Sequence, residues 1–415
     1  MTVADVLGLP NTRGRAPLIV AQSVDALGTG LFLPFAVVYF HAAKGIPLTT
    51  VGAILSVAAL LALPAGPLVG SLIDRLGPRR VVVASNLVRV ATFAGYVAAD
   101  EPWQLVVLAT VTIWGESMFW PGAAALVAQV ADTGQRARWY AMERALRNVG
   151  IGAGGLLGSV LVTWGGTSGY TVVVVLNAVS FLVAGGLVAA WRPVARVEPS
   201  PAPARESVER GGYRAVLTDR AFLGVLTTVC VFALCDLALT VLLSAYVIDA
   251  RGLPAWQPGV LFAVNTALVV LAQTAVSGAI ERHRRPRVLQ VAAGIWVVSF
   301  ALFAAVPAGA AGVAFWVLTA AMVVFTLAEL LQAPTSSALT VAIAPAHLRG
   351  RYLGLEELMW SVARVLAPVT FTWLLARGPG LPWLALSGCC LAAVVVLQRL
   401  NRVLPAHAQR ETAGV

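Results

Sequence analysis

The chain has 415 residues, of which 59% are hydrophobic and only 12% are charged. Soluble domains are about 45–50% apolar and about 25% charged, so this composition excludes an ordinary soluble enzyme, and it is far too apolar for a disordered chain. The formal net charge of +10 would indicate nucleic-acid binding only if the basic residues formed one patch, but they are distributed between long apolar runs. These runs are continuous over about 20 residues, the length of a membrane-spanning helix. We therefore expect an all-α polytopic membrane protein.

The apolar runs predict twelve transmembrane helices, which fits the length because one span and its loop take roughly 35 residues. The first run contains Asp25 and continues without a small-residue cleavage site, so we expect an uncleaved helix rather than a signal peptide. In chain order the predicted spans are 17–40, 51–73, 81–99, 103–130, 143–163, 170–191, 221–248, 258–280, 288–306, 312–333, 353–376 and 382–398.

Basic residues gather on alternate connections between these spans. With a cytoplasmic N-terminus, 23 of the 29 Lys and Arg residues lie on cytoplasmic segments, and three lie on outer loops, namely Lys44, Arg251 and Arg377. Because Lys and Arg are retained on the cytoplasmic side, both termini are predicted to face the cytoplasm. The use of one Lys against 28 Arg is typical of a GC-rich bacterial genome, so we expect a bacterial plasma (inner) membrane.

The only long hydrophilic connection divides the chain into six spans plus six. We expect an N-terminal six-helix bundle at 1–191, a Pro-rich cytoplasmic linker at 192–220, a C-terminal bundle at 221–400 and a cytoplasmic tail at 401–415. The halves also resemble each other. An offset of 213 aligns Arg136 with Arg349 and Glu143 with Glu356, and earlier in each half an offset of 207 aligns Gly52 with Gly259. Chance similarity between apolar helices would rarely align charged residues as well, so we predict two pseudo-symmetric bundles with a binding site near the bilayer midplane.

The connection between spans 2 and 3 carries a recognisable motif, Gly70-Ser-Leu-Ile-Asp74-Arg75-Leu-Gly77-Pro-Arg79-Arg80. A Gly at a helix end allows a neighbour to approach closely, and Gly77 allows a tight reversal. The motif resembles the signature loop of the major facilitator superfamily, with Pro78 where the family has a basic residue. The resemblance implies the major facilitator fold, and it implies that Asp74, Arg75, Arg79 and Arg80 form a cytoplasmic gating loop. A simple positive-inside turn is the alternative.

Span 5 carries Gly150, Gly154 and Gly158 at a spacing of four residues. The spacing is similar to the antiporter motif of the drug:proton branch of that superfamily, although this chain lacks the motif's Pro and its last Gly. Small residues at this spacing are also a common way for membrane helices to pack. The Arg that the family usually has on span 4 is absent here, and Glu116 is the charged residue of that segment.

Four acids lie well inside predicted spans: Asp25, Glu116, Asp236 and Glu329. A charge at the bilayer centre costs about 2.5–3.5 kcal/mol even on the most permissive scale, so such acids are candidates for function. The resemblance places helices 1, 4, 7 and 10, which carry them, around the central cavity. An acid there that binds either a proton or a cationic substrate would meet the requirement for antiport.

Helical spacing puts polar and aromatic side chains on the same faces as these acids. We therefore add Gln22, Phe32, Trp120 and Gln332 to the candidates for a lipophilic, often cationic ligand. The alternative is structural pairing of the acids with the three arginines that also fall inside spans, which are Arg89, Arg147 and Arg364.

These features predict a proton-coupled exporter of a small lipophilic compound, with a metabolite importer or facilitator and a non-transporting sensor as alternatives. No His lies within a span, and no Walker loop is present, so we expect neither a histidine relay nor ATP as the energy source. Cys230, Cys235, Cys389 and Cys390 lie within spans, and we expect no disulfide, metal or cofactor. The expected partners are a small-molecule substrate, protons and the lipid bilayer, with no nucleic acid and a monomeric chain.

Overall fold

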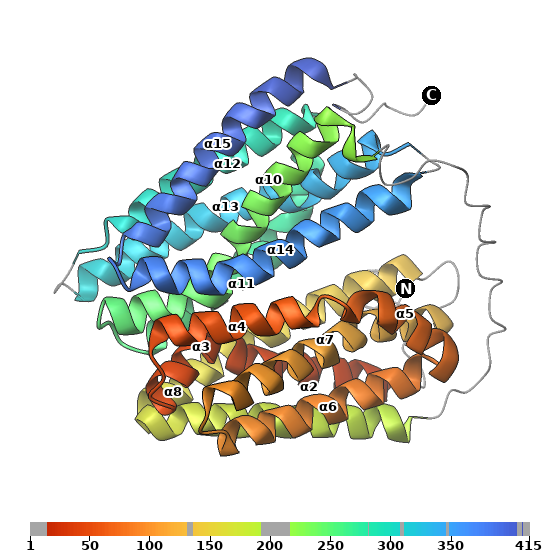
Figure 1. Cartoon of the computed structure of the whole chain (residues 1–415), viewed down its shortest axis with the longest axis vertical. Helices are drawn as coiled ribbons and strands as arrows, with labels where there is room; N and C mark the ends of the chain where they lie inside the picture. The colour runs from red at the N-terminus through yellow and green to blue at the C-terminus, as the bar shows by residue number, and fades with distance from the viewer. Residues whose placement is uncertain are drawn as a thin grey trace, which may run out of the picture. The chain divides into compact units, whose positions relative to one another are not determined.

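The structure is a computed structural model that describes residues 15–130, 136–191, 216–280, 282–307, 311–345, 348–404 and 409. Within these residues the chain is helical, with no strand (Figure 1). Nine of the described helical segments are long and apolar enough to cross a membrane. Their contacts divide the chain into two compact units, Met1–Ala204 with Pro258–Thr266, and Arg205–Gln257 with Ala267–Val415. Most of the predicted linker, 192–215, and most of the predicted tail lie outside the described residues.

The first unit begins with a helix that Pro34 distorts. α2 (Ala16–Phe32) passes into the 3-10 turn η1 (Leu33–Phe35), α3 (Ala36–Val38) and the wide π-turn η2 (Tyr39–Ala43). Proline has no N–H and cannot continue the α-helical ladder, which explains the break. The remaining helices of this unit are α4 (Leu48–Ala62), α5 (Ala65–Leu76), α6 (Pro78–Ala98), α7 (Pro102–Val130) and α8 (Arg136–Ala190).

One element differs from the expected one helix per span. Span 2 is interrupted at Pro64, which separates α4 from α5. Spans 5 and 6, predicted as the separate helices 143–163 and 170–191, are two helices that meet at a kink at Gly166 (φ 52°, ψ −132°) and together carry the label α8. An unbroken helix of 55 residues would be about 80 Å long, more than twice the hydrocarbon thickness, so the reversal at Gly166 divides α8 into two crossings. With α8 counted twice, the nine long apolar segments give ten crossings, and α7 and the α4–α5 pair, at predicted spans 4 and 2, bring the described helices to twelve.

The second unit repeats the order of the first. Its helices are α10 (Arg220–Leu237), the π-turns η3 (Ala238–Leu242) and η4 (Ala245–Ala250), α11 (Trp256–Ile280), α12 (Arg285–Ala304), α13 (Ala311–Ile343), α14 (Arg349–Leu375) and α15 (Leu381–Val403). Only the segment Pro258–Thr266 of α11 groups with the first unit by its contacts. In the first unit α6 packs on α7 and α8, and in the second α12 packs on α13 and α15 (Figure 1).

Hydrogen bonds show the internal repeat at single residues. The Tyr39 hydroxyl donates to the carbonyl of Tyr96, 57 positions along the chain at 3.1 Å, and the Tyr246 hydroxyl donates to the carbonyl of Phe303, again 57 positions along. Lys44 and Arg251 likewise donate to carbonyls 53 positions along. The donor in the first unit and its counterpart in the second are 207 positions apart, and so are the two acceptors, which is the offset seen in the sequence. The two units are therefore pseudo-symmetric in structure as well as in sequence.

Glycines hold the first half of α8 directly against α2. A Cβ at Gly150 would lie 2.7 Å from the Cβ of Ala26, and one at Gly158 would lie 2.5 Å from the carbonyl oxygen of Leu31. At Gly154 it would overlap the backbone of Leu27. The spacing of four residues therefore serves close helix packing in this structure.

We predict that Gly154→Ala lowers the free energy of unfolding by about 1–3 kcal/mol, because the new methyl group meets backbone that cannot rotate away. The measurement is thermal unfolding of the purified chain in detergent. Gly186→Ala is the matched control, since a Cβ at Gly186 of α8 has nothing within 4 Å and alanine favours a helix. Equal melting temperatures for the two variants would contradict the packing role.

Candidate functional site

The first unit contains a buried ion pair between α2 and α6. The guanidinium of Arg89 donates to Oδ1 of Asp25 at 2.6 Å, and the two side chains are only 5% and 4% exposed. Arg89 also donates to Oδ1 of Asn86, one turn earlier on α6, at 3.0 Å. The rings of Phe119 on α7 and Phe181 on α8 lie over the guanidinium, at 4.4 and 4.0 Å from their centroids. The structure therefore gives Asp25 the arginine partner that the sequence left as an alternative.

Glu116 gives this site a second acid beside a single arginine. It lies on α7 next to Gly115, which packs against the Arg89 side chain, and it interacts electrostatically with Asp25. Unlike Asp25, Glu116 is exposed and makes no ion pair with a described residue. The geometry thus separates the roles of the two acids, because Asp25 is neutralised in the interior and Glu116 is accessible.

A second polar layer of this unit joins α2, α7 and α8. The Gln22 amide donates to Oε1 of Glu143 at 3.0 Å, and the Arg147 guanidinium lies 4.4 Å from the centre of the Trp120 ring. Glu143 and Arg147 are four residues apart on α8 and interact electrostatically. Sequence reasoning missed Glu143 as a candidate, although the repeat that aligns it with Glu356 had marked it.

The aromatic candidate Phe32 occupies a packed environment. Its ring contacts those of Phe93, at a centroid distance of 4.9 Å, and of Tyr39, Phe40 and Tyr96. The contact with Tyr96 is stacked and the other three are edge-to-face, and both kinds stabilise the aromatic interior formed by α2, η2 and α6. The structure thus places Phe32 among packing residues.

The second unit holds the other two acids on α10 and α13. Oδ1 of Asp236 is buried and has no hydrogen-bond partner among the described residues. Asp236 also interacts electrostatically with Glu329, a second acid. Gln332, one turn beyond Glu329 on α13, is only 4% exposed, and its Oε1 is also without a described partner. A buried oxygen without a hydrogen donor is costly, which makes Asp236 and Gln332 candidates for binding a hydrogen donor.

Pro334 interrupts the backbone hydrogen bonding of α13 close to this site. Because Pro334 has no N–H, the carbonyl of Leu330 has no helical partner, and the Gln273 amide of α11 lies 3.5 Å from it. This contact ties α11 to α13 next to Gln332.

Arg364 does not reach any of the four acids. It donates to Glu357 on the same helix, α14, at 3.1 Å, and both side chains are about half exposed or more. Exposed pairs of this kind contribute about 0–1 kcal/mol.

The predicted gating loop joins α5 to α6. Gly77 has φ 79°, as a tight reversal requires, while Asp74, Arg75 and Arg80 are exposed. Arg79 donates to the carbonyls of Val188 and Ala189 at the end of α8, where a cation is favoured. A Cβ at Gly70 would have no described residue within 4 Å, so the described part of the chain does not show the close approach expected there. Glu281, which the offset of 207 aligns with Asp74, lies outside the described residues.

Two of the four cysteines lie in contact in the interior of the second unit. The sulfurs of Cys235 on α10 and Cys390 on α15 are 3.5 Å apart, and all four cysteines are free thiols. The predicted spans had not indicated this contact, because Cys235 and Cys390 are 155 positions apart in the chain.

Comparisons with known proteins agree with this architecture. The Major Facilitator Superfamily model matches residues 18–368. The multidrug resistance protein MdtH of Cronobacter sakazakii is 26% identical over 379 residues, covering 89% of this chain and 90% of that protein. MdtH of Salmonella arizonae is 24% identical over 381 residues, covering 90% of each.

Solved transporter structures share the fold at low identity. The nucleoside transporter NupG superposes with a TM-score of 0.75 at 13% identity, covering 94% of this chain and 100% of that one. A bacterial homologue of the lysosomal transporter Spinster superposes with a TM-score of 0.73 at 14% identity, covering 97% and 99%. This chain is a multi-pass membrane transporter rather than an enzyme. It belongs to the Major Facilitator Superfamily.

Proposed function

We propose that the protein exports a small lipophilic compound, such as a drug or secondary metabolite, in exchange for protons. The observation that carries the proposal is the buried oxygen of Asp236, which has no described hydrogen donor, together with the electrostatic interaction of Asp236 with a second acid, Glu329. Two interacting carboxylates within a membrane-spanning bundle repel each other, and a proton or a cationic substrate relieves that repulsion. Competition between the two ligands for one site couples their movements.

The names of the relatives support the choice of substrate class. Proteins that match about 90% of this chain are multidrug resistance proteins. The exposed acid Glu116 and the partly buried Trp120, one turn further along α7, suit a lipophilic cation.

We propose that transport follows alternating access. In this proposal 1–191 and 221–400 are the two moving bundles, 192–220 is the cytoplasmic linker, and Asp74, Arg75, Arg79 and Arg80 act at the cytoplasmic gate. Both termini face the cytoplasm of the bacterial inner membrane, and the chain acts as a monomer that binds no nucleic acid. The positive-inside distribution of Lys and Arg supports this orientation.

The test uses everted membrane vesicles with an acidic lumen, in which the lumenal pH is followed while lipophilic cations, neutral drugs and zwitterions are added one at a time. We expect at least one lipophilic cation to release protons from vesicles that contain the protein and not from vesicles that lack it. If no compound moves protons while labelled substrates still equilibrate, the facilitator alternative replaces this proposal. Saturable binding of a compound without flux would instead identify a sensor.

A further inference from the structure

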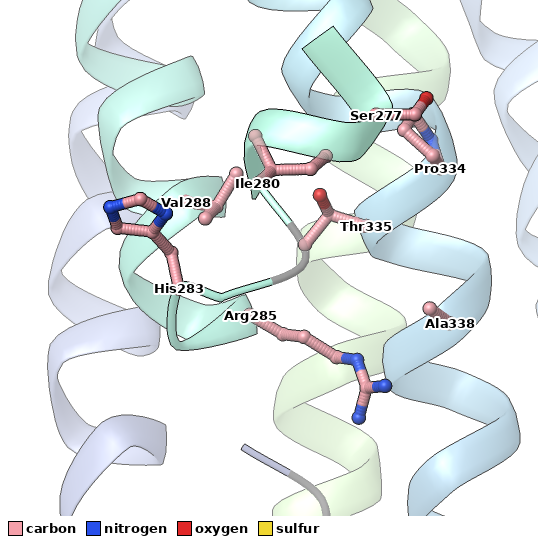
Figure 2. Close-up of a pocket in the computed structure, with 8 residues that line it drawn as sticks. All are labelled: Ser277, Ile280, His283, Arg285, Val288, Pro334, Thr335 and Ala338. Atoms are coloured by element: carbon pink, nitrogen blue, oxygen red, sulfur yellow. The ribbon is translucent and has the colours of Figure 1, made fainter. Parts of the chain in front are cut away.

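The connection between α11 and α12 borders two neighbouring cavities in the second unit. The larger has a volume of about 460 Å³ and the smaller about 160 Å³, and both are lined by Ile280, His283 and Val288. Figure 2 shows the smaller cavity, with Thr335 of α13 pointing into it and the Arg285 side chain extending from the start of α12 toward Ala338.

Arginines dominate the polar lining of the larger cavity. Arg282, Arg284 and Arg287 all line it, and none of the three makes an ion pair with a described residue. The first turn of α12 contains no acid, and no side chain caps its N-terminus. The positive end of the helix dipole therefore adds to the arginine charges.

The remaining walls are apolar and belong to the membrane-spanning helices. Val288 and Val291 of α12 and Leu331 of α13 line the larger cavity, and the Val291 side chain is 55% exposed. Because α11 ends at Ile280 and α12 begins at Arg285, the arginines lie where the hydrocarbon meets water and the apolar wall continues into the bilayer. The positive-inside rule accounts for arginines in this loop, but it does not require that they surround a cavity with an apolar wall.

We propose that this cavity is a binding site for an anionic glycerophospholipid of the adjacent leaflet. The phosphate lies among Arg282, Arg284 and Arg287, and an acyl chain lies along Val291 and Leu331. Basic pockets between membrane helices on the cytoplasmic side are suited to such headgroups. The site is separate from the four intramembrane acids, so the proposal does not depend on the transported compound.

Native mass spectrometry of the purified full chain in detergent tests the proposal, with phosphatidylglycerol, phosphatidylcholine of the same acyl chains, and inorganic phosphate as separate probes. We expect phosphatidylglycerol to bind at least tenfold more tightly than phosphatidylcholine. Each arginine near an anionic headgroup is worth about 1 kcal/mol, so Arg284→Gln/Arg287→Gln should weaken phosphatidylglycerol binding about thirtyfold. The matched control, Arg399→Gln/Arg402→Gln, removes two exposed arginines near the end of α15 and should leave binding unchanged.

A second variant tests the cavity independently of the charge. Ala279→Trp fills the larger cavity and keeps every arginine, so it should also weaken phosphatidylglycerol binding by tenfold or more. Equal losses in the two double variants would show that only general surface charge matters, and full affinity in Ala279→Trp would show that the cavity is not used. Displacement of the lipid by millimolar phosphate would identify a simple anion site. Each of these three results overturns the proposal.

Discussion

Arg89→Met is expected to lower the free energy of unfolding by about 3–5 kcal/mol, the largest loss we predict for a single substitution. Asp25 is 4% exposed, and Arg89 is its ion-pair partner, so removing the arginine leaves a charge buried without compensation. Methionine is the stringent replacement, because its thioether packs well between the rings of Phe119 and Phe181 and little contact area is lost. The measurement is thermal and denaturant unfolding of the purified chain in detergent.

The double variant Arg89→Met/Asp25→Leu separates charge from packing. It removes both members of the pair, so most of the lost stability should return. Arg364→Met is the control for loss of an arginine inside a span, and it should cost no more than about 1 kcal/mol because the Arg364 pair with Glu357 is exposed. A double variant as unstable as Arg89→Met would show that the cost does not come from the unpaired Asp25.

Asp236→Asn should lower gradient-driven transport at least tenfold, because the site loses the carboxylate for which proton and substrate compete. Asparagine has nearly the same shape as aspartate but cannot take up or release a proton, and it cannot repel Glu329. Glu329→Gln removes the same repulsion from the α13 side, so it should give the same phenotype. Transport is measured as proton release on addition of the compound that the vesicle screen identifies.

Glu357→Gln is the matched control for these two variants. Glu357 is an acid of the same unit that lies about 65% exposed on α14, so its loss should leave proton-coupled transport at the native rate. Native coupling in both Asp236→Asn and Glu329→Gln would rule out this pair as the coupling site. A loss in Glu357→Gln of the same size would show that the assay reports general damage.

The helical content and the internal repeat could be predicted from the sequence because both follow from local composition. The offset of 207 that aligns Gly52 with Gly259 also relates the hydrogen bonds of Tyr39 and Tyr246. The reversal at Gly77 was expected because glycine takes positive φ at low cost.

Long-range pairing could not be predicted, because sequence spacing gives a helical face and not the neighbour that the face meets. Asp25 and Arg89 are 64 positions apart, and Arg79 and the α8 carbonyls that it binds are more than 100 apart. The sequence also could not show that Arg364 points toward Glu357, on its own helix, rather than toward one of the four acids. The division between spans 5 and 6, by contrast, was expected from the Gly-rich segment around Gly166, where the two helices of α8 meet at a kink.

The central claim, proton-coupled export that depends on Asp236, is tested most directly in proteoliposomes that contain only this protein. A labelled lipophilic cation identified by the vesicle screen is supplied outside liposomes with an acidic lumen. Its accumulation is followed with and without a protonophore, for the native chain, Asp236→Asn and Glu357→Gln. The account predicts accumulation above the outside concentration for the native chain and Glu357→Gln, collapse on adding the protonophore, and no accumulation with Asp236→Asn. Equilibration to equal concentrations in the native chain, whatever the pH gradient, would contradict it.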